Sequence, residues 1–246
     1  EKIYDDFQSR TKSYASMIAR TRDVKEGAAG AKRARVKAVI DPLFDSLDVG
    51  LITVHEFDGY VIARGHDPVK FGEAQADVPR IARALQGKAT SGIESIDGRL
   101  ALFTTLPIEN PNPDTQPPYV GAVTVGYFFD ESFAESMKTL VGSEIVIVEN
   151  GEPLAATNKL LQRKGTRLTE KSRRLVRGGR WFDIRYVALH PARTGRRTGL
   201  VIAVDNSRAK TIMFGSIAVS FCVVCAVFLV VLRRARSFSE TLTQPI

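Results

Sequence analysis

Arg64, His66 and Asp67 fall within four positions of one another in the stretch ARGHDPVKFG, which follows an apolar run. A histidine beside an aspartate can serve general acid–base catalysis when both side chains converge on one substrate atom. Neighbouring residues of an extended chain point to opposite faces, so His66 and Asp67 do not converge in this way. No nucleophile motif and no zinc-ligand spacing accompanies them in the sequence. We therefore assign no catalytic residue and no metal site.

Two interpretations of this stretch remain open. In the structural one, Asp67 and Pro68 form a turn and Phe71 is an apolar plug in a tight loop. In the binding one, Arg64 pairs with an anionic group and His66 exchanges hydrogen bonds with the ligand. The candidate ligand-binding residues are Arg64, His66, Asp67, Phe71, Arg80, Thr104 and Tyr127, with Thr105 and Arg83 as further candidates. For the two helical arginines in this set, a solvated helix face is the competing interpretation.

Asx-Gly pairs between apolar runs predict the hairpins that position these residues. They occur at Asp58-Gly59, Asp97-Gly98 and Asn150-Gly151. Before the first pair, residues 1–47 show the spacing of one or two helices, which would span about 70 Å if continuous.

Proline, aspartate and glycine residues predict where the helices begin and end. We expect Pro42 to kink or restart the N-terminal helix. Asp77 is the expected N-cap of a helix with Pro79 in its first turn and Gly87 just past its end. Asp130 is the expected N-cap of a second short helix.

The segment from Ile212 to Leu232 contains no charged residue and is long enough to cross a bilayer as a helix. Arg233, Arg234 and Arg236 follow it, which predicts a cytoplasmic C-terminus and an extracytoplasmic location for residues 1–211. Such an arrangement predicts a further membrane helix before the first residue. Cys222 and Cys225 lie inside the span and are interpreted as small apolar residues. The net charge of +8 is not arranged as a basic stripe with aromatic residues, so we expect no nucleic-acid partner.

These patterns together predict an α+β fold: a long N-terminal helix, two tandem PAS-like antiparallel-sheet units, then a transmembrane helix. The arrangement, with the stretches VIARGHDPVKFG, ALQGKATSGIES and VGAVTVGYFFDESF, resembles a double Cache domain, the extracytoplasmic sensor of bacterial chemoreceptors, sensor kinases and cyclases. The closing TLTQPI resembles the start of a HAMP linker. The expected boundaries are 1–47 for the N-terminal helical segment, 48–140 for the membrane-distal unit, 141–208 for the smaller membrane-proximal unit, 212–232 for the membrane helix and 233–246 for the linker.

The resemblance implies that the membrane-distal unit holds a ligand and that the membrane helix passes the signal to a cytoplasmic output domain. The amino-acid-binding branch of the family has an Arg-x-Trp pair in the distal unit, whereas Trp181 here follows Arg180 directly in the second unit. We therefore expect a small organic ligand, with an organic anion as the favoured class, and no cofactor. We also expect a homodimer that pairs through the N-terminal helix. The alternative is a membrane-anchored structural or protein-interaction module without a small ligand.

Overall fold

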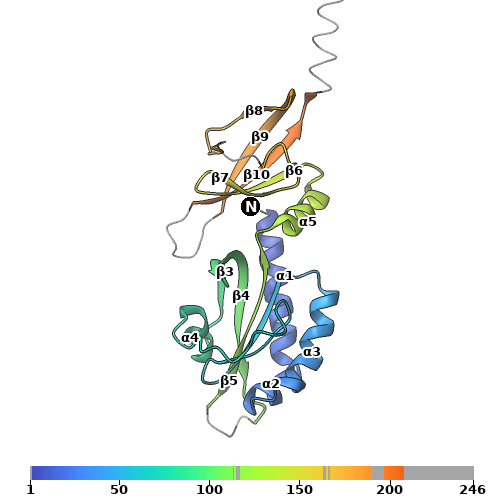
Figure 1. Ribbon diagram of the computed structural model, residues 1–246. Helices are drawn as coiled ribbons and strands as arrows, with labels where there is room; N and C mark the ends of the chain where they lie inside the picture. Colours follow the sequence, from blue (N-terminus) through green and yellow to red (C-terminus); the bar gives the residue numbers. More distant parts are fainter. Residues whose placement is uncertain are drawn as a thin grey trace, which may run out of the picture. The chain divides into compact units, whose positions relative to one another are not determined.

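The computed structural model shows the predicted α+β fold, with N-terminal helices and two five-stranded sheets (Figure 1). Contacts divide the chain into two compact units, Glu1–Ser172 with Arg185–Ile202, and Arg173–Ile184 with Ala203–Ile246. The structure describes residues 2–112, 114, 117–162, 165, 167–189 and 197–207.

The N-terminal segment forms three helices, α1 (Lys2–Arg20), α2 (Arg22–Ala29) and α3 (Arg33–Ser46), where the sequence predicted one or two, so the segment is not continuous. The chain leaves the helical conformation at Thr21, where ψ is 127°. It turns again after α2, where Ala31 takes a φ of 49°. Gly27 permits this second reversal, because a Cβ there would lie 2.6 Å from Val36 Cγ2 of α3. Pro42 lies inside α3, so the helix does not restart there.

The first sheet has the strand order β2-β1-β5-β4-β3. Figure 1 shows α1, α2 and α3 on one side of it and α4 on the other, and α4 packs against β3, β4 and β5. We call these sides the helix face and the α4 face. The elements are β1 (Leu51–Glu56), β2 (Val61–Arg64), α4 (Pro79–Leu85), β3 (Thr90–Ile96), β4 (Arg99–Glu109) and β5 (Tyr119–Phe128).

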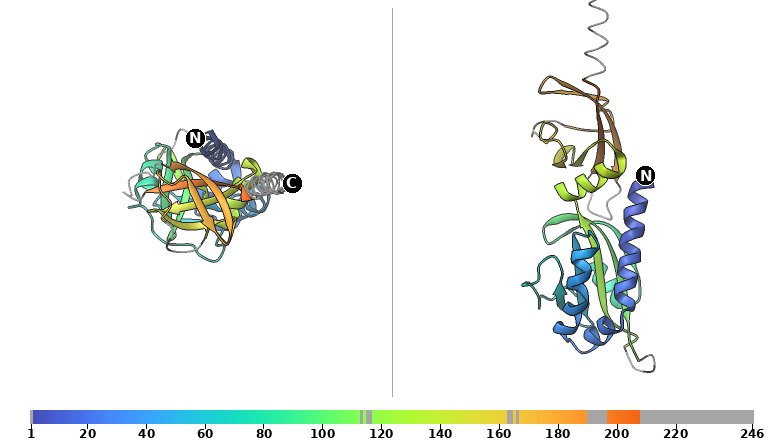
Figure 2. Two further views of the ribbon diagram at one scale, coloured as in Figure 1. Left: turned by 90° about the horizontal axis from the view of Figure 1, so that it is seen from above. Right: turned by 90° about the vertical axis from the view of Figure 1, so that its right-hand side faces the viewer.

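Helix α1 runs along β4 and β5 (Figure 2). It buries one stripe of side chains. Phe7, Thr11, Ala15 and Ile18 are all at most 2 % exposed, and their spacing of three and four residues is that of an amphipathic helix. Phe7, Ala15 and Ile18 belong to one apolar cluster with side chains of the helix face such as Val125. Helix α4 begins at Pro79, and its N-cap is Val78 without a side-chain hydrogen bond, so the predicted cap at Asp77 is wrong.

The second sheet has the order β7-β6-β10-β9-β8. Helix α5 (Glu131–Val141) precedes it, and the Asp130 carboxylate accepts the Phe133 N–H at 3.1 Å, which confirms the predicted cap. All three predicted Asx-Gly hairpins are confirmed by the antiparallel pairs β1–β2, β3–β4 and β6–β7. The strands are β6 (Glu144–Glu149), β7 (Glu152–Ala156), β8 (Arg174–Arg177), β9 (Arg180–Leu189) and β10 (Thr198–Asp205).

Among the described residues, no helix has both the length and the apolar character needed to cross a membrane. The predicted span 212–232, with Cys222 and Cys225, and the predicted linker 233–246 lie outside the described residues.

Candidate functional site

A row of polar residues crosses the α4 face of the first sheet. Arg64 on β2 lies opposite Thr53, and Thr53 lies opposite Thr124 on β5. The row continues through Thr105 on β4 to Thr90 on β3. Residues that pair directly across strands share one face of a sheet, so these side chains form one band, whose four threonines we call the threonine row. The hydroxyls of Thr105 and Thr124 hydrogen-bond to each other at 2.9 Å.

Arg64, at one end of this row, is only 1 % exposed. Its Nη1 donates to the Lys70 carbonyl and to Glu73 Oε2, both at 2.8 Å. Its Nε and Nη2 have no hydrogen-bond partner in the described part of the chain. These two atoms lie on the same edge of the guanidinium, the edge at which arginine binds a carboxylate through two parallel hydrogen bonds. The carboxylate of Asp97 lies 3.5 Å from Nε, within ion-pair distance.

Arg80 of α4 supplies a second buried guanidinium above the same face. It is 7 % exposed, and its Nη1 donates to Glu94 Oε1 at 3.0 Å. Its Nε is buried without a hydrogen-bond partner among the described residues, and the guanidinium carbon lies 5.8 Å from the centre of the Phe103 ring. Burial lowers the pKa of Arg80, and the charge of Glu94 opposes that shift. Arginine remains protonated in proteins, so the site holds a second positive charge.

His55 is the third buried polar side chain near both arginines. It is 1 % exposed, and its Nε2 lies 3.0 Å from Gln75 Oε1. Burial lowers the pKa of His55 to about 4, and the charges of Arg80 and Arg64 act in the same direction. His55 is therefore neutral at pH 7, and the positive charge of this interior comes from the two arginines.

Asp97 and His66 close the site at the β3–β4 turn. His66 Nε2 lies 3.2 Å from Asp97 Oδ2, and Nδ1 lies 3.3 Å from the Ile52 carbonyl. Both partners are acceptors, so a neutral His66 donates to one of them only. Burial lowers the pKa of His66. Burial alone would raise the pKa of Asp97, but the hydrogen bond with His66 and the charges of Arg64 and Lys70 outweigh it and lower that pKa.

The predicted site residues do not all meet at this place. Arg64, His66 and Arg80 lie on the α4 face, and the interpretation of Arg80 as a solvated residue is wrong, whereas Arg83 is exposed. Asp67 belongs to the following turn, where its carbonyl accepts the Lys70 N–H at 3.2 Å.

Thr104 and Tyr127 lie on the helix face, opposite Arg64. The hydroxyls of Thr104 and Thr11 hydrogen-bond at 2.8 Å. The Tyr127 ring packs edge-on against Phe7 at 5.0 Å, and burial raises the pKa of Tyr127. Phe71 is 50 % exposed beneath the Arg33 guanidinium, so its interpretation as an apolar plug is wrong.

The sequence analysis missed His55, Thr53, Thr124, Glu94 and Asp97 as residues of this site. A signal existed for two of them, because Leu51, Thr53 and His55 alternate along β1 and so share one face. Thr124, Glu94 and Asp97 come to the site because the pairing of other strands joins them to the sheet of β1 and β2. The alternation of residues within one strand does not predict that pairing. No group of three or more potential metal ligands occurs within the described ranges.

A family model described as the double sensory domain of two-component sensor kinases matches residues 8–209. Among solved structures, the periplasmic domain of Vibrio cholerae LuxQ is 13 % identical, with a TM-score of 0.55, covering 83 % of this chain and 95 % of that one. The sensor domain of the V. cholerae histidine kinase DctB is 8 % identical, with a TM-score of 0.50, covering 82 % of this chain and 97 % of that one. At these identities the likeness supports the fold alone. A search of curated proteins returned no match. Because the family model covers most of its length, the chain belongs to the double Cache family of sensory domains of two-component sensor kinases.

Proposed function

We propose that this chain is the extracytoplasmic sensory part of a transmembrane receptor and that it binds a small organic anion on the α4 face of its first sheet. The ligand carboxylate pairs with the Nε and Nη2 edge of Arg64, above the threonine row. Arg80 closes over the ligand from α4. The observation that carries this proposal is the buried edge of Arg64, where two N–H groups lack a hydrogen-bond partner in the described structure. Leaving such groups unpaired costs about 1–3 kcal/mol each, which a bound carboxylate would recover.

The sheet offers a route by which occupancy of this site changes other elements. Strand β5 carries Thr124 and ends at Phe128, and α5 begins at Glu131. On the opposite face, β4 holds α1 through the hydrogen bond between Thr104 and Thr11. A ligand that joins α4 to β4 and β5 therefore favours one arrangement of α1 and α5 over another, which is a population shift. In this proposal the homodimer pairs through the N-terminal helices and transmits the shift.

The membrane part of the proposal is supported by sequence. The segment 212–232 has no charged residue and is followed by three arginines within four positions. The LuxQ domain of similar fold is described as periplasmic. In this proposal the closing TLTQPI begins a HAMP linker that leads to a cytoplasmic output domain.

A matched pair of arginines on α4 tests the ligand site. The chain is screened against mono- and dicarboxylates by thermal shift, and each hit is measured by isothermal titration calorimetry. Arg80→Gln should weaken binding by about tenfold or more, since a hydrogen bond to a charged group is worth about 1.5–3 kcal/mol. Arg83→Gln is the control, because Arg83 lies on the same helix and is exposed. Equal effects of the two substitutions, or no effect of either, would refute the site.

Cysteine labelling tests the location. In a chain with Cys222 and Cys225 replaced by serine, Lys88→Cys should react with a membrane-impermeant maleimide while the inner membrane is intact. Ser239→Cys, beyond the predicted span, should react only after that membrane is permeabilised. The reverse order would overturn the proposed orientation.

A further inference from the structure

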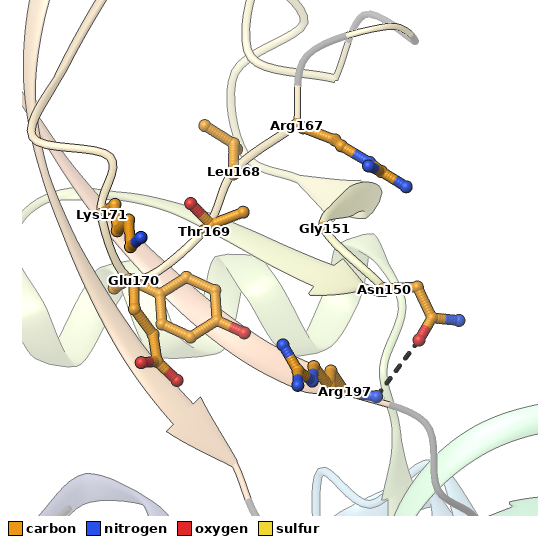
Figure 3. Close-up of a pocket in the computed structure, with 9 residues that line it drawn as sticks. Asn150, Gly151, Arg167, Leu168, Thr169, Glu170, Lys171 and Arg197 are labelled. Carbon is orange, nitrogen blue, oxygen red and sulfur yellow. Dashed lines mark hydrogen bonds between the residues drawn. The ribbon is translucent and has the colours of Figure 1, made fainter.

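The second sheet carries a cavity of about 470 Å³ that is separate from the site of the first sheet (Figure 3). It lies between the β6–β7 turn, the loop 167–171, Tyr186 of β9 and Arg197 before β10. Its volume is in the range of small-molecule sites, about 300–1,000 Å³. All of these residues belong to the same compact unit of the chain.

Backbone hydrogen bonds hold the walls of this cavity together. The Asn150 N–H donates to the Arg197 carbonyl at 2.7 Å. The Arg197 N–H donates in turn to Asn150 Oδ1 at 3.2 Å, the dashed line in Figure 3. The Leu168 N–H donates to the Gly151 carbonyl at 2.8 Å and so fixes the loop to the turn. The cavity is therefore formed before any ligand binds.

Tyr186 adds a half-buried aromatic ring to the lining. Its ring lies directly over Gly199 of β10, where a Cβ would come within 2.1 Å of Tyr186 Cζ. Only glycine leaves room for the ring in this position. Burial raises the pKa of Tyr186, and Glu170 adds to the shift while Arg197 opposes it, so the phenol stays protonated and can donate a hydrogen bond.

The charge of the lining is strongly positive. Arg167, Lys171 and Arg197 line the cavity, and Glu170 is the acidic residue among the lining side chains. None of the three cationic side chains has an ion-pair partner among the residues that the structure describes. Surface cations in a concave site concentrate anions, and arginine binds carboxylates through paired hydrogen bonds.

We propose that this cavity is a second ligand site, which binds a small organic acid with two or more carboxylates. One carboxylate pairs with Arg197 and another with Arg167, while the Tyr186 hydroxyl donates to the ligand. The ligand needs two carboxylates because Arg167, Lys171 and Arg197, together with the one acidic residue Glu170, give the lining a net charge of +2. The chain then has two separate ligand-binding sites, one on each sheet.

Citrate is the probe for this site, and succinate and acetate are the comparison acids. Binding is measured by titration calorimetry on the whole 246-residue chain in a mild detergent at physiological salt. We expect affinity to fall from citrate to succinate to acetate. Arg167→Gln and Arg197→Gln should each weaken citrate binding by about tenfold, the value of one charged hydrogen bond. Thermal unfolding without ligand checks that both variants fold.

Arg185→Gln is the matched control, because Arg185 is exposed and precedes Tyr186 on β9, so its side chain points to the other face of the strand. It should leave citrate affinity unchanged. An Arg185→Gln effect as large as that of Arg197→Gln would mean unspecific attraction and would overturn the proposal. So would undetectable citrate binding at millimolar concentration. Loss of citrate binding in Arg80→Gln, with retention in Arg197→Gln, would assign citrate to the first sheet instead.

Discussion

Thr104 and Thr105 are neighbours on β4, but their buried hydroxyls serve opposite faces of the first sheet. Thr104 hydrogen-bonds to Thr11 of α1 at 2.8 Å, whereas Thr105 hydrogen-bonds to Thr124 of β5 at 2.9 Å. Both side chains are at most 1 % exposed. One residue therefore attaches the N-terminal helix, and the other belongs to the floor of the proposed ligand site.

This pair gives a prediction that separates stability from binding. Thr104→Val should lower the free energy of unfolding by about 1 kcal/mol, because it removes a buried hydrogen bond, and should leave anion affinity unchanged. Thr105→Val should weaken anion binding by about three- to tenfold, since it removes a hydroxyl from the site. Chemical denaturation and titration calorimetry measure the two effects. A larger loss of affinity in Thr104→Val than in Thr105→Val would place the ligand on the helix face.

Asp97→Asn should strengthen binding of the anion to Arg64. The carboxylate of Asp97 lies 3.5 Å from Arg64 Nε and competes with a ligand carboxylate for that edge. Asparagine removes the negative charge and tolerates the positive φ of 50° that the turn requires. We expect the dissociation constant from calorimetry to fall about threefold to tenfold, which corresponds to about 0.6–1.4 kcal/mol. Weaker binding in this variant would show that Asp97 helps to hold the ligand.

Gly27→Ala should destabilise the chain although alanine favours helices. A Cβ at position 27 would lie 2.6 Å from Val36 Cγ2, so α2 and α3 would have to separate. Overpacking of this kind costs about 1–3 kcal/mol, more than the gain of about 1 kcal/mol in helix propensity. Gly30→Ala is the control, because a Cβ there meets the flexible Lys32 side chain at 3.3 Å. Equal unfolding free energies for the two variants would contradict the close packing of these helices.

The hairpins could be predicted from sequence because their signal is local. Asp97 and Asn150 precede glycines and take φ values of 50° and 54°, as a two-residue turn between antiparallel strands requires. The sequence leaves open whether the N-terminal segment is one continuous helix, and the packing of Gly27 on Val36 decides for the break after Ala29.

In the candidate site, too, some residues have a local sequence signal and others depend on tertiary packing. Arg64 was identified because an arginine at the end of an apolar strand is conspicuous. Thr104 and Thr105 were both candidates, and the sequence cannot tell which of two neighbouring threonines faces the site without the register to β5. The burial of Arg80 depends on how α4 packs on the sheet, which its short sequence does not specify.

His55 should make folding stability depend on pH between about pH 6.5 and pH 4. Its pKa in the folded chain is about 4, whereas an unperturbed histidine has a pKa of about 6.5. Between these values the unfolded chain binds the proton and the folded chain does not. Stability is therefore complete above pH 6.5 and falls with pH, by at most about 1.4 kcal/mol per unit. Arg64 and Arg80 act in the same direction, because their positive charges oppose protonation of His55.

His55→Gln should remove this dependence, because glutamine does not titrate and can still hydrogen-bond to Gln75. The loss of unfolding free energy from pH 7 to pH 5 should be smaller in the variant by about 2 kcal/mol. His66, whose pKa burial also lowers, contributes equally to both proteins, so the difference between the two curves isolates His55. Asp97 has a lowered pKa, so its contribution is lost at more acidic pH. An equal change of the unfolding free energy between pH 7 and pH 5 in the variant and the wild type, measured by chemical denaturation at each pH, would contradict a buried, neutral His55.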